Sequence, residues 1–199
     1  YMGSVFKTNQ FDTFYHEHPR TYSVNSFVFI SKLLGMKIKK IEFPQRYGGN
    51  IRVYMSNNNN KLKFDISKIL KKEILFEKNF MHLKNKIDIW KKNKNLIINN
   101  LIEKGYTIYG KAFPGRASIL INLLKLNVEN LKGIFEQNNS PKNFHFAPGT
   151  KIPILPDRNI HKILNKKSII INFSWHISKE IKKYLKKMKV KNRVINIIA

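Results

Sequence analysis

A strand, a loop and a helix in succession are predicted by the stretch YTIYGKAFPGRASILINLLKL, residues 106–126. Tyr106–Tyr109 is the expected strand, Gly110–Gly115 the loop, and Ala117–Leu126 a helix with apolar residues at helical spacing. This order places backbone amides and the positive end of a helix where a phosphate can bind. The spacing lacks the three glycines of the dinucleotide-binding fingerprint, so an ordinary strand-to-helix turn remains the alternative.

Strands and helices continue to alternate through the rest of residues 105–199. Further strands are predicted at Leu131–Phe135, Ser168–Phe173 and Val194–Ile198, and helices at Asn159–Leu164 and Ser178–Met188. The strand Ser168–Phe173 is continuously apolar, which is typical of a parallel strand buried on both faces. Alternating strands and helices imply a parallel sheet covered on both faces. We therefore predict an α/β fold class, with a Rossmann-like domain over residues 105–199.

The first half of the chain predicts a different organisation. Ser23 is the predicted N-cap of a helix that runs to about Leu34. Alternating residues predict strands at Met36–Phe43 and Ile51–Met55 that can pair antiparallel. The run Asn57–Asn60 predicts a boundary, and the apolar spacing that follows is that of helices. The expected domains are residues 1–56, a helical connection at 61–104, and residues 105–199.

The composition is strongly basic, with a net charge of +26 at pH 7. A charge of this size favours a polyanionic partner, such as nucleic acid or an anionic membrane surface. The lysines, however, are spread through the whole chain and accompany many Asn and Ile residues, which indicates a biased genome composition. We therefore expect neither a nucleic acid nor a membrane as the partner, and a basic nucleic-acid-binding protein is the less favoured alternative.

Two absences from the sequence narrow the function classes. The chain has no cysteine, which excludes disulfides, cysteine-ligated zinc and a thiol nucleophile within this segment. It has no apolar run of the ~20 residues that a membrane helix needs, and no signal-peptide pattern. Tyr1 is not an initiator methionine, so we expect the sequence to begin inside a longer, cytoplasmic protein.

The strongest local cluster is the run Tyr15-His16-Glu17-His18. Four polar side chains in a row cannot all face an apolar core without a large desolvation cost. Histidine side chains titrate near neutrality and a carboxylate can orient them, so the run could supply a general base. A surface turn with chance histidines is the alternative. A zinc site is less favoured, because His16 and His18 would point to opposite faces of a strand.

Two further motifs lie in the second half of the chain. Ala147–Ile154 contains two prolines and a glycine and predicts a rigid loop that can shape a pocket wall. Ser174-Trp175-His176 follows the apolar strand directly, at the carboxyl end where open α/β sheets usually bind ligands. His176 could also begin a helix without any functional role. Lys111 and Arg116 could contact a phosphate or could be solvated.

Taken in order, these motifs resemble the C-terminal region of the sugar C-methyltransferase family, whose members methylate a ring carbon of a nucleotide-linked deoxysugar. The first motif is the most specific, because the family typically carries Phe-Asp, Tyr-His-Glu-His and Tyr-Ser in this order. The matching stretches are FDTFYHEHPRTYS at 11–23, GGNIRVY at 48–54, YGKAFPGRASILIN at 109–122, APGTKIPI at 147–154 and SWHISKEI at 174–181.

The resemblance implies a larger enzyme, with a cysteine-rich zinc module, an S-adenosylmethionine (SAM) domain and a second Rossmann-like domain that helps to bind the nucleotide sugar. Residues 1–56 would be the C-terminal, β-hairpin part of the SAM domain, and residues 105–199 the nucleotide-sugar-binding domain. This chain has neither the zinc cysteines nor a glycine-rich SAM loop. The donor site is therefore expected mostly outside the chain, and zinc only in the N-terminal module.

The resemblance also implies roles for individual residues. His18 is expected to be the general base, Glu17 to orient it or contact the sugar, and Tyr15 to hydrogen-bond the substrate oxygen or the enolate. No metal ligand is expected, and a non-catalytic nucleotide-sugar-binding domain is the main alternative. The residues expected to hold the nucleotide-diphosphate sugar are His16, Gly110, Lys111, Arg116, Ser118 and His176.

Overall fold

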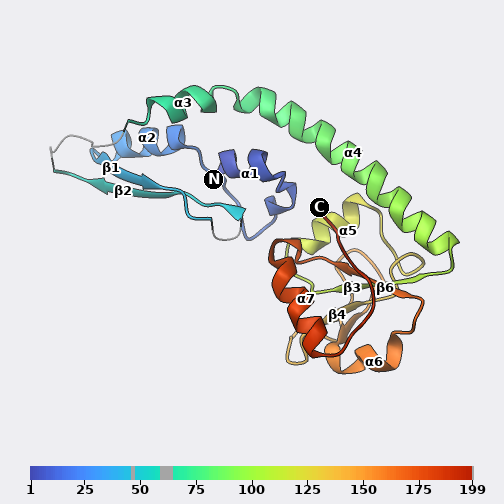
Figure 1. Ribbon diagram of the computed structural model, residues 1–199. Coiled ribbons are helices and arrows are strands. Elements are labelled where there is room, and N and C mark those ends of the chain that lie inside the picture. The colour runs from blue at the N-terminus through green and yellow to red at the C-terminus, as the bar shows by residue number, and fades with distance from the viewer. Residues whose placement is uncertain (46–47, 59–64, 199) are drawn as a thin grey trace. The chain divides into compact units, whose positions relative to one another are not determined.

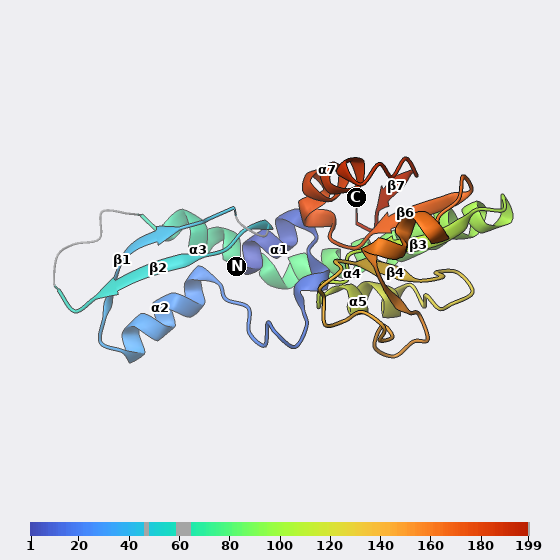
Figure 2. The same cartoon turned by 90° about the horizontal axis from the view of Figure 1, so that it is seen from below.

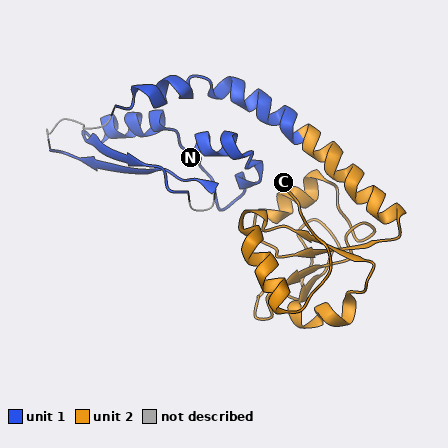
Figure 3. Ribbon diagram, in the orientation of Figure 1, with its two compact units in different colours: residues 1–87 blue, residues 88–199 orange. Residues whose placement is uncertain are grey.

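The computed structural model describes residues 1–45, 48–58 and 65–198 (Figure 1). The chain divides into two compact units, unit 1 at Tyr1–Ile87 and unit 2 at Asp88–Ala199 (Figure 3). The long helix α4, Phe76–Glu103, contributes residues to both units. The domain boundaries expected near residues 57–60 and 104 stay a prediction, and part of the first lies outside the described residues.

Unit 1 contains helices and a two-stranded antiparallel sheet, as the sequence predicts for residues 23–56. Ser23 caps the helix that follows it, because its hydroxyl accepts a hydrogen bond from the amide of Ser26 and the two residues form a capping box. Gly35 ends this segment with a φ of 61°. The elements are α1 (Met2–Thr8), η1 (Phe11–Thr13), α2 (Val24–Leu33), β1 (Lys37–Glu42), β2 (Arg52–Ser56) and α3 (Ser67–Glu73).

The core of unit 1 lies where α2 packs along the hairpin (Figure 2). Val24, Ile38 and Ile41 are its buried centre. A carboxylate from α3 fixes the start of α2: buried Glu73 accepts hydrogen bonds from the amides of Val24 (2.7 Å) and Asn25 (2.9 Å). A negative charge at a helix N-terminus is stabilised by the amides and by the helix dipole. This carboxylate therefore ties α3 to the start of α2.

Two consecutive glycines between β1 and β2 allow α1 and the segment after it to lie close to the hairpin. Gly48 and Gly49 have φ values of 90° and 118°, which side-chain-bearing residues rarely adopt. A Cβ atom on Gly48 would lie 1.4 Å from Gln10 Nε2, and one on Gly49 would lie 2.4 Å from Ser4 Oγ. Glycine is therefore required here by close approach as well as by backbone conformation. The buried Gln10 directly precedes η1, so this contact helps to place the polar cluster at residues 15–18.

Unit 2 contains a five-stranded parallel sheet with the order β5-β4-β3-β6-β7, which confirms the predicted α/β, Rossmann-like fold class (Figure 1). All residues of β6 are buried, as its apolar run predicts. Helices α6 and α7 pack on one face of the sheet through Ile160, Ile181 and Leu185. The strands are β3 (Thr107–Lys111), β4 (Ile134–Glu136), β5 (Ile154–Pro156), β6 (Ser168–Asn172) and β7 (Val194–Asn196). The helices are α5 (Ala117–Leu123), η3 (Asp157–Asn159), α6 (Ile160–Ile163), η4 (Trp175–Ile177) and α7 (Ser178–Lys187).

The strand order places a reversal between β3 and β6. From β3 the chain adds β4 and β5 on one side, and then returns to add β6 and β7 on the other. β3 and β6 pair along their full lengths, from Thr107 opposite Ser168 to Lys111 opposite Asn172. Open parallel sheets bind ligands outside the carboxyl ends of the two strands at such a reversal. The loops after Lys111 and Asn172 are therefore where a ligand of this unit would be sought.

Two local predictions in unit 2 are wrong. Gly110 and Lys111 belong to β3 and not to a loop. Gly110 is required there by packing and not by a turn, because a Cβ atom on it would lie 2.8 Å from a ring carbon of Phe173. The segment Ala147–Ile154, expected only as a rigid loop, leads into an edge strand, β5, that the sequence analysis missed. Proline is compatible with an edge strand, since one side of such a strand needs no amide donor.

None of the described helices combines the length and the apolar character that crossing a lipid bilayer requires.

Candidate functional site

The Tyr15–His18 cluster forms a turn directly after η1 in unit 1. The amide of His18 donates a hydrogen bond to the carbonyl oxygen of Tyr15 (2.8 Å), which closes the turn. Phe11 and Asp12 precede it and are 5% and 0% exposed, so the turn projects from an anchored segment. His16, Glu17 and His18 are exposed. A polar turn on a buried base is the arrangement expected from four consecutive polar side chains.

Tyr15 contacts the two other residues expected to be catalytic, Glu17 and His18. The Tyr15 hydroxyl donates a hydrogen bond to Glu17 Oε2 (2.9 Å), and the rings of Tyr15 and His18 lie 4.7 Å apart between centroids. His16 lies beside them, with its Nε2 atom 3.9 Å from Glu17 Oε1. The structure thus brings an imidazole, a phenol and a carboxylate together within four residues, which is a set of groups capable of moving a proton.

His18 is also held by a residue that the sequence analysis did not single out. Its Nδ1 atom lies 2.9 Å from the hydroxyl oxygen and 3.2 Å from the carbonyl oxygen of Thr13. Within the described part of the chain, nothing hydrogen-bonds to Nε2, the other ring nitrogen. The only sequence signal for this contact is a hydroxyl residue five positions before the histidine.

Two other predicted residues lie near the carboxyl edge of the parallel sheet in unit 2. Arg116 follows β3 and precedes α5, and His176 lies in η4 after β6, so both flank the reversal in strand order. Burial lowers the pKa of His176, the nearby Arg116 guanidinium lowers it further, and Glu180 partly opposes these effects. Ser118 Oγ donates a hydrogen bond to the Gly115 carbonyl oxygen (3.0 Å), which holds the loop against α5. Arg116 thus adds a positive charge near an imidazole whose pKa is lowered.

Unit 2 is expected to lose stability at low pH through His176. Because its pKa is lowered from 6.5, the folded unit keeps the imidazole neutral at a pH where the unfolded chain takes up a proton. Proton uptake by the unfolded chain favours unfolding. The stability that the neutral His176 imidazole contributes is therefore fully present above about pH 6.5 and is lost as the pH falls below this value. His176→Gln should reduce the loss, measured by urea unfolding at about pH 8 and about pH 5. The same loss in the variant as in the wild type would contradict this role of His176.

Lys111 and Gly110 are not placed to hold a ligand, which corrects the expectation for both. The Lys111 side chain is 1% exposed and its Nζ atom lies 2.9 Å from Oδ2 of Asp157, a fully buried residue at the start of η3. The Tyr184 hydroxyl donates to the same oxygen (2.8 Å), and burial together with this hydrogen bond raises the pKa of Tyr184 to about 12. Gly110 is buried within β3. The sequence did not indicate this lysine–aspartate–tyrosine cluster, whose members lie up to 73 positions apart.

The loop after β3 is held by Glu136 and Lys142. The Phe113 amide donates to Glu136 Oε2 (2.7 Å), the Gln137 amide donates to Oε1 (2.9 Å), and Lys142 Nζ donates to the Phe113 carbonyl oxygen (2.7 Å). In Rossmann sheets, an acidic residue after the second strand binds the ribose hydroxyls of the cofactor. Both oxygens of Glu136 instead accept backbone amides. The Glu136 carboxylate is therefore already engaged by the chain's own amides, and this sheet offers no free acidic side chain at that position for SAM.

The described residues also contain no group of three or more His, Cys, Asp or Glu side chains that could hold a metal ion.

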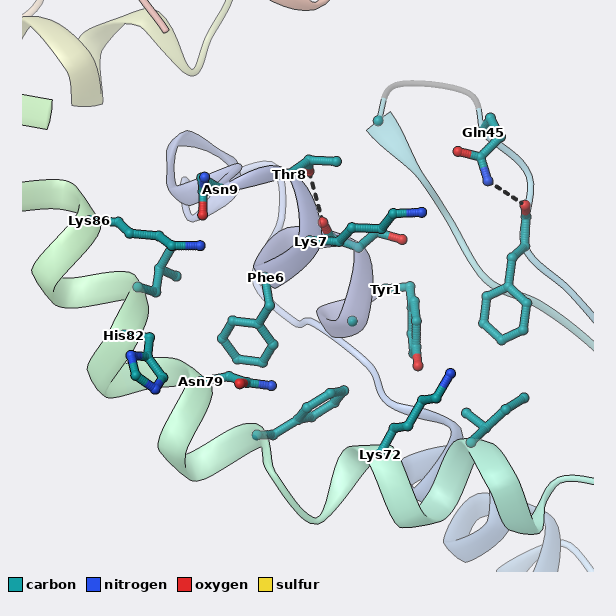
Figure 4. A pocket seen from close by; sticks show the side chains of 17 residues that line it. Tyr1, Phe6, Lys7, Thr8, Asn9, Gln45, Lys72, Asn79, His82 and Lys86 are labelled. Atoms are coloured by element: carbon teal, nitrogen blue, oxygen red, sulfur yellow. Dashed lines mark hydrogen bonds between the residues drawn. The ribbon is translucent and has the colours of Figure 1, made fainter. Parts of the chain in front are cut away.

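A separate cavity of about 580 Å³ lies within unit 1 (Figure 4). Its lining combines aromatic rings, such as those of Phe6 and Phe76, with the lysines Lys7, Lys72 and Lys86. The residues described around it include no carboxylate, so its charge favours an anionic over a cationic occupant. No member of the Tyr15–His18 cluster belongs to this described lining. The cavity and the cluster are therefore two different features of unit 1.

Comparison with known proteins gives a family and a relative. Residues 45–198 match the family model described as the C-methyltransferase C-terminal domain. The curated protein "C-methyltransferase NovU" of Streptomyces niveus is 21% identical over 160 residues, which cover 77% of this chain and 38% of the relative. The chain thus spans less than half the length of this relative. The family match begins at residue 45, so the Tyr15–His18 cluster lies outside it.

Proposed function

Since this chain belongs to the C-methyltransferase C-terminal domain family, we propose that it is part of an enzyme that transfers a methyl group from SAM to a ring carbon of a nucleotide-linked keto-deoxysugar. The observation that carries this proposal is that Tyr15 contacts both Glu17 and His18 in one exposed turn. A ring carbon becomes a nucleophile only when it loses a proton, and a proton beside a ketone is acidic enough for a positioned base to remove.

The proposed reaction begins with proton removal by His18. The imidazole takes the proton from the carbon beside the ketone, and the electron pair of that C–H bond moves to form an enolate, whose negative charge lies on the former ketone oxygen. The enolate needs a hydrogen-bond donor or a positive charge to stabilise it. The enolate carbon would then bond to the methyl carbon while the methyl–sulfur bond of the donor breaks, its electron pair staying on sulfur, and the ketone would form again.

Tyr15 is the proposed donor to the enolate oxygen. A phenol has one proton to donate, and in the structure that proton goes to Glu17. Stabilising the enolate therefore requires the Tyr15 hydroxyl to turn from Glu17 to the substrate. Glu17 would hold the phenol in place before the substrate arrives and then contact the sugar or the imidazolium. The His16 side chain is more exposed than that of Glu17, and His16 is assigned to substrate binding.

The nucleotide part of the substrate is proposed to lie at the carboxyl edge of the parallel sheet. Arg116, Ser118 and His176 surround the loop between β3 and α5, beside the reversal in strand order. Arginine suits a diphosphate because its planar fork can donate two hydrogen bonds to phosphate oxygens. SAM is proposed to bind outside the described residues, because the acidic residue of this sheet is engaged by backbone amides.

The proposal is tested by supplying the naturally encoded enzyme with SAM labelled in its methyl group and a thymidine diphosphate-linked 4-keto-6-deoxysugar. The label is expected on a ring carbon beside the ketone, identified by carbon NMR of the product. Label on an oxygen atom would contradict the proposal. Calorimetric binding of the sugar nucleotide without any transfer would support the second candidate, a non-catalytic nucleotide-sugar-binding domain. That candidate is favoured by the lack of a fitting donor site in the described parallel sheet.

A further inference from the structure

We infer that Thr13 is a positioning residue that fixes the tautomer of His18, with the proton on Nδ1 and the basic lone pair on Nε2. The catalytic part of this inference rests on the proposed function, whereas the tautomer itself is a property of this chain. Both oxygen atoms of Thr13 face the same ring nitrogen, at 2.9 Å for the hydroxyl and 3.2 Å for the carbonyl.

The carbonyl oxygen decides between the two tautomers. A carbonyl only accepts hydrogen bonds, whereas a hydroxyl can accept or donate. If Nδ1 carried a lone pair, it would face the lone pairs of the Thr13 carbonyl oxygen at 3.2 Å without a proton between them. With the proton on Nδ1, the ring donates to the carbonyl and the Thr13 hydroxyl oxygen can accept as well. Both contacts therefore favour the Nδ1–H form.

The tautomer decides whether His18 can act as a base toward a bound ligand. A neutral imidazole has one protonated and one basic nitrogen, and the hydrogen bond made by one nitrogen sets the role of the other. His18 Nδ1 faces the chain's own Thr13, whereas no atom in the described residues hydrogen-bonds to Nε2 of this exposed side chain. A proton on Nε2 would leave the ring unable to accept another from the ligand on that side.

Thr13 lies in a well-anchored segment, so its position relative to His18 is fixed. It is the last residue of η1, and the two residues before it, Phe11 and Asp12, are buried. The ring of Tyr15 contacts the His18 ring, and the backbone hydrogen bond from His18 to Tyr15 closes the turn between them. The His18 ring is thus held by Thr13 at one nitrogen and by Tyr15 at its side, which fixes its orientation as well as its tautomer.

Nitrogen NMR of the 199-residue chain tests the tautomer without any substrate. Long-range proton–nitrogen spectra of ¹⁵N-histidine-labelled protein at about pH 8, where ordinary imidazoles are neutral, should show His18 with a protonated Nδ1. His18→Gln identifies its signals by their loss. Thr13→Val removes the hydroxyl at nearly constant shape but keeps the backbone carbonyl, so His18 should stay protonated on Nδ1 in this variant and in Thr13→Ser. Signals of the remaining histidines report whether each variant is folded.

Two NMR results would overturn the inference: a wild-type His18 protonated on Nε2, or a folded Thr13→Val chain whose His18 has moved to the Nε2–H form although the Thr13 carbonyl is still present. In the naturally encoded enzyme, Thr13→Val should lower kcat by about two- to tenfold, because the His18 ring loses its shorter contact to Thr13 and is oriented less firmly, with little change in KM, and Thr13→Ser should restore it. An unchanged kcat in the Thr13→Val enzyme would remove the catalytic role of Thr13. An enzyme with no methyltransferase activity at all would refute the proposed function and leave the NMR result standing.

Discussion

Replacing His18 by alanine is expected to slow methyl transfer by the naturally encoded enzyme by about 10²–10⁴-fold, the usual cost of losing a general base. His18 is exposed, its Nδ1 faces both oxygen atoms of Thr13, and its ring lies beside the Tyr15 phenol that is proposed to stabilise the enolate. Alanine removes the proton acceptor and leaves the backbone of the turn unchanged. The loss should appear in kcat, measured by transfer of labelled methyl groups to the sugar nucleotide.

A matched control separates the base from a general effect of removing a histidine. His145 is also exposed and lies in unit 2, outside the proposed machinery, so His145→Ala should turn over as the wild type does. Calorimetry should show that His18→Ala still binds the thymidine diphosphate sugar, because the diphosphate is proposed to be held by the sheet edge. A His18→Ala enzyme that retains the wild-type rate would remove His18 from the reaction.

Replacing Lys111 by methionine is expected to lower the free energy of unfolding of unit 2 by about 3–5 kcal/mol. Methionine has a similar volume but no charge, so Asp157 would remain buried and charged, with Tyr184 as its hydrogen-bond donor among the described residues. The loss of stability comes mainly from the Asp157 carboxylate, because removing one partner of a buried ion pair leaves the charge of the other uncompensated. Both tryptophans, Trp90 and Trp175, lie in unit 2, so urea unfolding followed by tryptophan fluorescence reports on this unit.

Two further variants test this explanation of the Lys111 effect. The double variant Lys111→Met with Asp157→Leu should recover most of the lost stability, because apolar replacement of a whole buried pair is often neutral. Lys186→Met, which removes an exposed lysine from α7, should unfold close to the wild-type urea concentration. A Lys111→Met protein as stable as the Lys186→Met protein would show that the buried pair contributes little.

The parallel sheet of unit 2 could be predicted from the sequence because its strongest signals are local. The apolar run at Ser168–Phe173 contains the fully buried β6, and the strand-to-helix stretch at residues 106–126 contains β3 and α5. The edge strand β5 could not be predicted, because Pro153 before it and Pro156 at its end suggest a loop. Only pairing with β4 makes this segment a strand. Gly110 misled the prediction of the loop, since a glycine required by side-chain packing looks the same in sequence as one required by a turn.

The candidate site was predictable only where its contacts are local. Tyr15 contacts Glu17 and His18 within four positions, and these two contacts follow from the spacing of the residues in a turn. Asp157, the partner of Lys111, lies 46 positions from it in the sequence. Val24, whose amide donates to Glu73, lies 49 positions from that glutamate. Contacts at such separations depend on how the elements pack. A lysine expected to meet a phosphate therefore proved to be part of a buried ion pair.

Proton exchange in the absence of a methyl donor tests the central claim most directly. The naturally encoded enzyme and its His18→Ala variant are incubated in deuterium oxide with a thymidine diphosphate-linked 4-keto-6-deoxysugar, and deuterium in the sugar is followed by proton NMR. If the imidazole of His18 removes the proton, the wild type incorporates deuterium at the carbon beside the ketone at least ~10²-fold faster than the variant. Equal incorporation by the two proteins would contradict this assignment of the base.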